Sequence, residues 1–197
     1  MVFDKFNLDV NIEAGDKRTL AMEASSVGKE RCLVFLIRSK ADMEIENSNK
    51  QRAVMMTCEG GHDGCLTLLI RAGANVDAAD KDGKTSLIYA AMNGRTSCVQ
   101  KLISHKSLKS GLDDCDTEGV SSLMFAAQHA KTECVDLLIS NGVDVMKRDK
   151  AGRTALMYGA EIGCLDSELL MQKSELDAAD EEGNTALMKA AMSGQLN

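Results

Sequence analysis

The chain has 197 residues, of which 44% are hydrophobic and only 3% aromatic, and it contains neither Trp nor Pro. This composition is typical of a globular protein whose core is built from aliphatic side chains. Because 30 acidic residues outnumber 23 basic ones and the net charge is −7, the balance argues against nucleic acid and anionic membrane surfaces as partners.

The N-terminal sequence has no basic region followed by an apolar stretch, so it does not predict a signal peptide. No run of 18 apolar residues predicts a membrane span. The seven Cys are an odd number without secretory context, and they indicate reduced thiols in an intracellular protein. We therefore expect a cytoplasmic protein without membrane insertion.

Internal repetition organises the chain from its first residues onward. Residues 1–15 are predicted to be a partial unit, because Asp9-Val10-Asn11 matches Asp42-Met43-Glu44. Five units follow and a half unit ends the chain, so that 1–197 form a single domain. The predicted unit boundaries are 16–48, 49–81, 82–117, 118–150 and 151–181, with the half unit at 182–197.

One nine-residue segment marks the start of the later units. It begins at Gly83, Gly119, Gly152 and Gly183, and the intervals between these glycines are 36, 33 and 31 residues. Two further ladders keep the same period. They are Cys32, Cys65, Cys98 and Cys134, and Asn47, Asp80, Asp116, Asp149 and Asp180.

This pattern resembles the ankyrin repeat over nearly the whole chain. The motif Thr-Pro-Leu-His-x-Ala of that family is present as Thr/Ser-x-Leu-Met-x-Ala, and Gly73-Ala74-Asn75-Val76-Asp77 matches its Gly-Ala-Asp-Val-Asn segment. The resemblance implies an all-α solenoid of helix–turn–helix pairs with short hairpin tips. Its departures are the missing Pro and the replacement of His, for which we expect looser packing because Met specifies a core poorly. The residues in place of His are Met22, Met55, Ile88, Met124, Met157 and Met188.

Hydroxyl residues stand where they can cap the first helix of each unit. Leu and Ile at helical spacing give each second helix a buried stripe. Asp followed by Gly supplies the turn between units. The capping positions are Thr19, Thr85, Ser121, Thr154 and Thr185.

Motifs that suggest chemistry are incomplete. The segment Gly83-Lys84-Thr85 lacks the earlier glycine of a phosphate-binding loop, and the stretch from Asp114 has Phe125 where a calcium loop needs Glu. We expect neither cofactor nor metal. Equivalent Cys in stacked helices are too far apart for disulfides, so buried thiols are predicted, with Cys115 the best candidate for an exposed reactive thiol. His62 is expected to make a structural hydrogen bond, and His129 to be available for contacts.

The position just before the Ala-Ala pair carries a different kind of side chain from unit to unit. Three of the six aromatic residues occupy it. The resemblance places this register on the concave face, where large rings are typical anchors for a protein partner. The alternative is that the rings pack against neighbouring helices. We call this set the aromatic register, and it consists of Met56, Tyr89, Phe125, Tyr158 and Lys189.

Flanking side chains complete the predicted protein-binding surface, which mixes apolar and charged groups. In the groove they are Met92, Asn93, Gln128, His129, Glu161 and Ile162, with Met56 and the three rings; on the hairpin tips they are Lys81, Lys84, Lys150 and Arg153. The longer interval places a basic loop at 104–111, which we expect to be a solvated loop rather than a contact for an acidic partner.

The predicted function is non-catalytic: a scaffold or adaptor that binds another protein. The alternative is a targeting or regulatory segment of a larger multidomain enzyme, such as a kinase; a third hypothesis is a cysteine-based redox or metal sensor. Terminal repeats normally carry polar caps, and Leu187, Met188 and Met192 look uncapped. We therefore expect either a longer array or end-to-end association of the terminal repeats.

Overall fold

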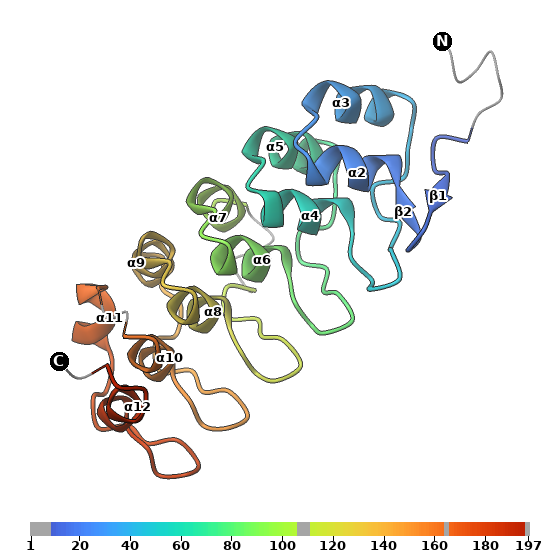
Figure 1. The fold of residues 1–197 in the computed structure, drawn as a ribbon. Coiled ribbons are helices and arrows are strands. Elements are labelled where there is room, and N and C mark those ends of the chain that lie inside the picture. The colour runs from blue at the N-terminus through green and yellow to red at the C-terminus, as the bar shows by residue number, and fades with distance from the viewer. Residues whose placement is uncertain (1–8, 106–110, 164–165, 196–197) are drawn as a thin grey trace.

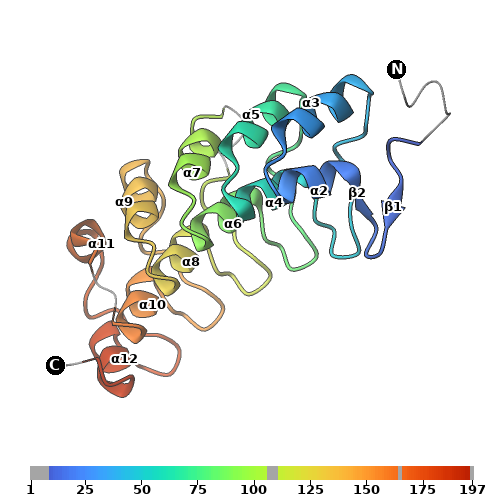
Figure 2. The same cartoon turned by 45° about the horizontal axis from the view of Figure 1, so that its top comes forward.

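A computed structural model describes residues 9–105, 111–163 and 166–195 of the protein. These residues form a solenoid of helix pairs stacked in a single file (Figure 1). The first helices of the pairs form one layer beside the hairpin loops, and the second helices form the other layer (Figure 2). Sequential neighbours pack against each other within each layer. The first helices are α2 (Leu20–Ser26), α4 (Ala53–Gly60), α6 (Ser86–Met92), α8 (Ser122–Gln128), α10 (Ala155–Glu161) and α12 (Ala186–Met192).

The second helices run back along the first ones and close each pair. They are α3 (Glu30–Arg38), α5 (Asp63–Arg71), α7 (Thr96–Ile103), α9 (Thr132–Ser140) and α11 (Glu168–Lys173). The predicted all-α solenoid is therefore confirmed. None of the helices in the described residues is long and apolar enough to cross a membrane.

Hairpins connect the pairs. The first hairpin is a short antiparallel ladder of β1 (Glu13–Ala14) and β2 (Arg18–Thr19). Single bridges such as Ala79 to Thr85 hold later hairpins. Gly83 has φ of 82° at a tip, and a Cβ there would lie 2.8 Å from the backbone nitrogen of Thr117 in the next hairpin. Glycine is therefore required both by the left-handed backbone and by the close stacking of hairpins.

The predicted helix caps form in four of the first helices. In each, the hydroxyl of the capping residue accepts a hydrogen bond from the backbone N–H three residues later, which satisfies a group that a helix start leaves free. Thr154 precedes α10 without making this bond, so the prediction is wrong there. The four caps are Thr19, Thr85, Ser121 and Thr185.

The core runs along the whole stack between the two layers. The side chains that replace the histidine of the family motif are buried from Met22 to Met157 and form one apolar ladder, while Met188 on α12 is half exposed. Leu187 on the same helix is 66% exposed, whereas its equivalent Leu156 is 2% exposed. The last described helix therefore presents an apolar stacking face to solvent.

Candidate functional site

Four of the five members of the aromatic register lie in the core rather than on the surface, and Lys189 is half-buried. Tyr89 is 7% exposed, Phe125 8% and Tyr158 3%, and Met56 is buried as well. The expectation of large rings standing on a solvated groove is therefore wrong. The rings are buried because each lies on a first helix whose neighbours pack against both of its sides.

The tyrosine hydroxyls explain why these polar rings can be buried. Tyr89 donates to Oδ2 of Asp80 and Tyr158 donates to Oδ2 of Asp149, each across 2.7 Å. The other carboxylate oxygen, Oδ1, accepts two backbone N–H groups of the hairpin; for Asp149 these belong to Ala151 and Arg153. Each pair thus fastens a helix to the hairpin that precedes it, and no buried polar group is left unsatisfied there.

Burial is the largest cause of a raised pKa for both tyrosine hydroxyls, and the bonds to Asp80 and Asp149 raise it further. Burial also acts to raise the pKa of Asp149, but the hydrogen bonds from Tyr158 and Arg153 outweigh it and hold that pKa below its usual value. The tyrosines therefore remain protonated donors, and the aspartate remains an ionised acceptor.

Cationic side chains cover two of the rings. The guanidinium of Arg153 lies 4.4 Å from the centroid of the Tyr158 ring, and its Nε donates to Oδ2 of Asp149 at 2.9 Å. The ammonium of Lys84 lies 5.3 Å from the centroid of Phe125. These two predicted contact residues are half-buried and belong to the packing of the rings as well as to the surface.

The last unit uses a different pair in the same register. Lys189 replaces the tyrosine, and its Nζ lies 2.8 Å from Oδ2 of Asp180. The hydrogen bond and charge of Asp180 raise the pKa of Lys189. The relationship between the two positions, nine residues apart, is therefore preserved although the chemistry of the pair changes.

The flanking residues form the exposed part of the predicted surface. They stand at the ends of successive first helices and in the turns that follow, and the stacking of α6, α8 and α10 aligns them in one row. Met92 and Asn93 are half-buried, and the other four are exposed, with Ile162 at 39%. We call these six the inner row: Met92, Asn93, Gln128, His129, Glu161 and Ile162.

Two members of the inner row are anchored to their own helices. Asn93 Nδ2 donates to the carbonyl oxygen of Tyr89 at 2.9 Å, and Nδ1 of His129 lies 3.0 Å from that of Phe125. Each side chain is therefore held in place by a backbone carbonyl group of its own helix. An ordered polar group loses less conformational entropy on binding than a free one.

The hairpin tips carry the remaining predicted contact residues. Lys81 and Lys150 are exposed, and their backbone N–H groups donate to Asn49 and Glu118 of the preceding hairpins. The backbone positions are therefore fixed by the stacking. The Lys150 ammonium lies 3.7 Å from a carboxylate oxygen of Glu118, and this exposed ion pair contributes little to stability.

The remaining candidate groups have structural environments. Nε2 of His62 lies 3.1 Å from the carbonyl oxygen of Ser26 in the previous unit, which confirms its structural role. Three members of the cysteine ladder are buried as predicted, namely Cys65, Cys98 and Cys134. Cys32 is exposed instead, because no described helix pair precedes it.

Cys115 is not the exposed thiol that the sequence suggested. It is half-buried, burial raises the pKa of its thiol, and its Sγ donates to the carbonyl oxygen of Asp113. Among the residues that the structure describes, no group of three or more His, Cys, Asp or Glu side chains is arranged to hold a metal ion. The centre of the basic loop, residues 106–110, lies outside the described residues.

The sequence contained the signal for the Tyr–Asp pairs. Each member of the ladder Asn47, Asp80, Asp116, Asp149 and Asp180 precedes a member of the aromatic register by nine residues. Asp80 and Tyr89 are one such pair, and Asp149 and Tyr158 are another. Gln51 carried no comparable signal; its Nε2 donates to the hydroxyl of Tyr89 at 2.7 Å from the hairpin one unit earlier.

Comparison with known proteins agrees with this architecture. The family described as ankyrin repeats (three copies) matches the chain over residues 21–113, 105–177 and 123–197. No curated protein matches the chain. Since the family match extends over most of the sequence and the stacked helix pairs have the same repeat, the chain belongs to the ankyrin-repeat family.

Proposed function

We propose that the protein is a non-catalytic adaptor or scaffold that binds a polypeptide partner along the inner row and the neighbouring hairpin tips. Ankyrin repeats are general protein–protein interaction modules. The observation that carries the proposal is the alignment of exposed, differing side chains on a rigid stack whose core positions are nearly uniform. Variation within a constant frame provides specificity without changing the fold.

The chemistry of this surface favours a mixed polar and apolar peptide segment. Ile162 and the edge of Met92 provide apolar area, while Gln128 and His129 provide hydrogen-bonding groups. Lys81 and Lys150 lie on the tips beside this row, where they would meet acidic side chains of the partner. The buried rings act from below by holding the row in place rather than by touching the partner.

Photo-crosslinking tests the proposal with a matched pair of positions. A photoreactive amino acid replaces Gln128 on the inner row, or Gln100, which is also exposed but lies on the second helix α7. We expect a discrete crosslinked product in lysate at position 128 and none at position 100. The same product at both positions, or none at position 128, would contradict the assignment of the binding face.

Charge reversal gives an independent test of the tips. Lys81→Glu together with Lys150→Glu should weaken the same crosslink and leave the unfolding transition nearly unchanged, because neither side chain is buried. An unchanged crosslink would restrict the binding surface to the inner row.

The alternative is a targeting segment of a larger enzyme. It is favoured by one observation: α12 exposes Leu187, Met188 and Met192, which are apolar side chains of a stacking face. Further repeats or another domain on this face would bury them. The sequence of the full-length transcript distinguishes this arrangement from an adaptor of ankyrin repeats alone. We propose a cytoplasmic location for either form, consistent with the free cysteines among the described residues.

A further inference from the structure

The hairpins of the solenoid share one backbone conformation at their tips. In each described hairpin a tip residue has its φ in the left-handed region, which glycine enters more easily than any other residue. The first two hairpins have Lys17 and Lys50 at this position, with φ of 61° and 58°. The later hairpins have glycine, with φ between 76° and 82°, namely Gly83, Gly119, Gly152 and Gly183.

Lysine is unfavourable at this position of the hairpin. A side chain in the left-handed region brings its Cβ too close to the backbone, and the stacking of the tips adds a second restriction. A Cβ on Gly83 would lie 2.8 Å from the backbone nitrogen of Thr117 in the next hairpin. Glycine would therefore serve the fold better at positions 17 and 50, and the two lysines indicate a role outside the fold.

The charge of both lysines is left uncompensated by the fold. Lys17 and Lys50 are exposed, and neither forms an ion pair with another of the described residues. Arg52, two residues after Lys50, is paired instead: its Nη2 lies 2.9 Å from Oε1 of Glu46. The lysines therefore offer their ammonium groups to a partner, whereas the neighbouring arginine does not.

The third hairpin extends the two lysines into a row. Lys81 is exposed, and its backbone N–H donates to the carbonyl oxygen of Asn49, directly beside Lys50. Two exposed carboxylates, Asp16 and Asp82, share these tips. We call the three cations the lysine row: Lys17, Lys50 and Lys81.

The balance of charge is reversed on the later hairpins. There the exposed tip side chains of Glu118, Glu181 and Glu182 outnumber that of Lys150. The Lys150 ammonium, moreover, lies 3.7 Å from a carboxylate oxygen of Glu118. An acidic segment of a partner is therefore attracted to the first three tips and repelled by the last one.

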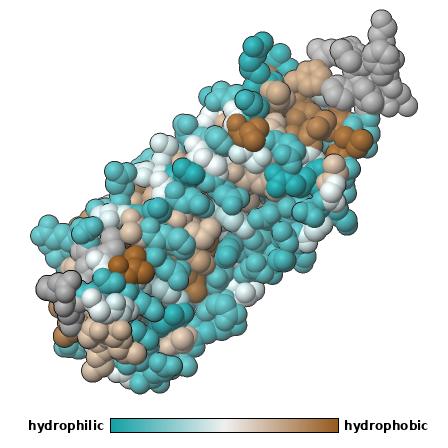
Figure 3. Space-filling model, viewed as in Figure 1, coloured by the Kyte–Doolittle hydropathy of each residue, from teal (hydrophilic) through white to brown (hydrophobic). Residues whose placement is uncertain are grey.

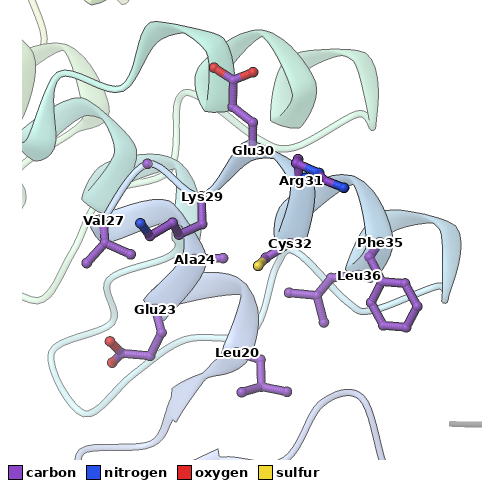
Figure 4. A pocket seen from close by; sticks show the side chains of 11 residues that line it. Leu20, Glu23, Ala24, Val27, Lys29, Glu30, Arg31, Cys32, Phe35 and Leu36 are labelled. Atoms are coloured by element: carbon purple, nitrogen blue, oxygen red, sulfur yellow. The ribbon is translucent and has the colours of Figure 1, made fainter. Parts of the chain in front are cut away.

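Apolar surface lies apart from the lysine row. A hollow between α2 and α3 is lined by Leu20, Phe35 and Leu36, among others, but by no member of the row (Figure 4). Along the edge where the hairpins stack, the surface is mostly hydrophilic (Figure 3). The tips can therefore recognise a partner by charge rather than by apolar contact.

The spacing of the tips indicates the form of the segment that they fit. Packed helices lie about 8–10 Å apart, and the tips follow the stacking of the first helices. A peptide in the extended polyproline conformation advances about 3.1 Å per residue, so three residues span about 9 Å. Every third side chain of such a peptide therefore faces a new tip.

We infer that the lysine row binds an acidic, extended segment of the partner in which a carboxylate recurs at every third residue. The inference rests on the proposed binding function and names the chemistry of its partner. It is carried by uncompensated lysines at positions where the backbone favours glycine, and by the reversal of charge on the later tips. On a chain with a net charge of −7, the row is a local site of the opposite sign.

A labelled peptide of four Glu-Ser-Gly triplets tests this inference by fluorescence anisotropy with the full chain at low salt. We expect Lys17→Gly and Lys50→Gly each to weaken its binding about threefold, the size of one exposed ion pair. The same peptide with Gln in place of Glu should not bind. A peptide of the same composition with its glutamates adjacent should bind more weakly, because they cannot face separate tips.

Lys40→Gly is the matched control. Lys40 is exposed and has φ of 60°, and it follows the end of α3 instead of standing on a hairpin. The variant removes the same charge and the same left-handed side chain, so it should bind the peptide like the wild type. All three glycine variants should keep or raise the urea midpoint, because glycine enters the left-handed region without steric cost.

Equal affinities of Lys50→Gly and Lys40→Gly for the peptide would overturn the inference, and so would equal binding of the spaced and adjacent glutamates. A lower urea midpoint of Lys50→Gly would give the lysine a role in the fold and overturn it as well. Equally tight, row-dependent binding of an oligothymidylate would assign the row to phosphates instead. If the peptide fails while the crosslink at Gln128 persists, the inference is wrong and the proposed function stands.

Discussion

Tyr158 and Asp149 are joined by a 2.7 Å hydrogen bond between the phenol hydroxyl and Oδ2, and Tyr89 and Asp80 repeat the same bond two units earlier. The bond connects a helix to the hairpin before it, and the proposed contact residues Lys81, Lys84, Lys150 and Arg153 stand on such hairpin tips. The rigidity of the proposed binding surface therefore depends on buried groups beneath it.

Tyr89→Phe should destabilise the protein more than Tyr158→Phe. Without the Tyr89 hydroxyl, the side-chain amide of Gln51 and Oδ2 of Asp80 both lose a partner. Asp149 keeps the Nε of Arg153 at 2.9 Å when Tyr158 is changed. Leaving a buried acceptor unsatisfied costs about 1–3 kcal/mol, and we expect the Tyr89 variant in the upper part of this range. Urea unfolding measures the difference; the reverse order would contradict it.

Phe125→Tyr tests the opposite change, in which an added hydroxyl should increase the stability of the fold. Phe125 stands nine residues after Asp116, as the tyrosines stand after Asp80 and Asp149, but it has no hydroxyl to donate. We expect the added hydroxyl to stabilise the fold by about 0.5–1.5 kcal/mol by making the same bond. A higher urea midpoint with an unchanged slope supports this expectation, whereas a lower midpoint would show that the new oxygen does not reach the carboxylate.

Phe125→Ala separates a core role of the ring from a direct contact role. The ring is buried, so its removal leaves a cavity and should cost about 3–5 kcal/mol, with a clear decrease in Tm. A ring on a solvated concave face would leave the Tm nearly unchanged when it is removed. If a thermal scan of the variant shows the Tm of the wild type, the ring lies on the surface and the core role is contradicted.

The frame of the molecule could be predicted from the sequence because each repeat fixes its own helices, caps and turns locally. Periodicity gives the register of a side chain but not its depth, since depth depends on how closely the neighbouring helices approach. For this reason the sequence aligns Tyr89 with Phe125 and Tyr158 correctly but does not decide between the concave face and the core. The nine-residue spacing from Asp80 to Tyr89 is the signal in the sequence for a hydrogen bond between the two side chains, and the depth of the ring comes from the structure.

The stability contributed by Asp149 should be lost in acid. Its pKa is lowered in the folded protein, so the carboxylate stabilises the fold at every pH above the unfolded value of about 3.9, and the contribution disappears as pH falls through the folded pKa. Asp149→Asn should therefore be less stable than the wild type at pH 7, with the difference shrinking below about pH 4. A difference that stays constant from pH 7 to pH 3 would contradict the role of the charge.

Substitutions of Lys189 test whether the residue nine positions after the aspartate stabilises the fold by bonding to its carboxylate. Lys189→Met leaves Asp180, whose side chain is almost completely buried, without its 2.8 Å cation, and we expect a lower urea midpoint. Lys189→Tyr should recover most of the loss, because a tyrosine nine residues after the aspartate donates to Oδ2 in two other units. Lys189→Phe is the matched control: it supplies the ring without the hydroxyl and should remain below the tyrosine variant. If Phe and Tyr recover equally, packing of the ring rather than the hydrogen bond stabilises this register.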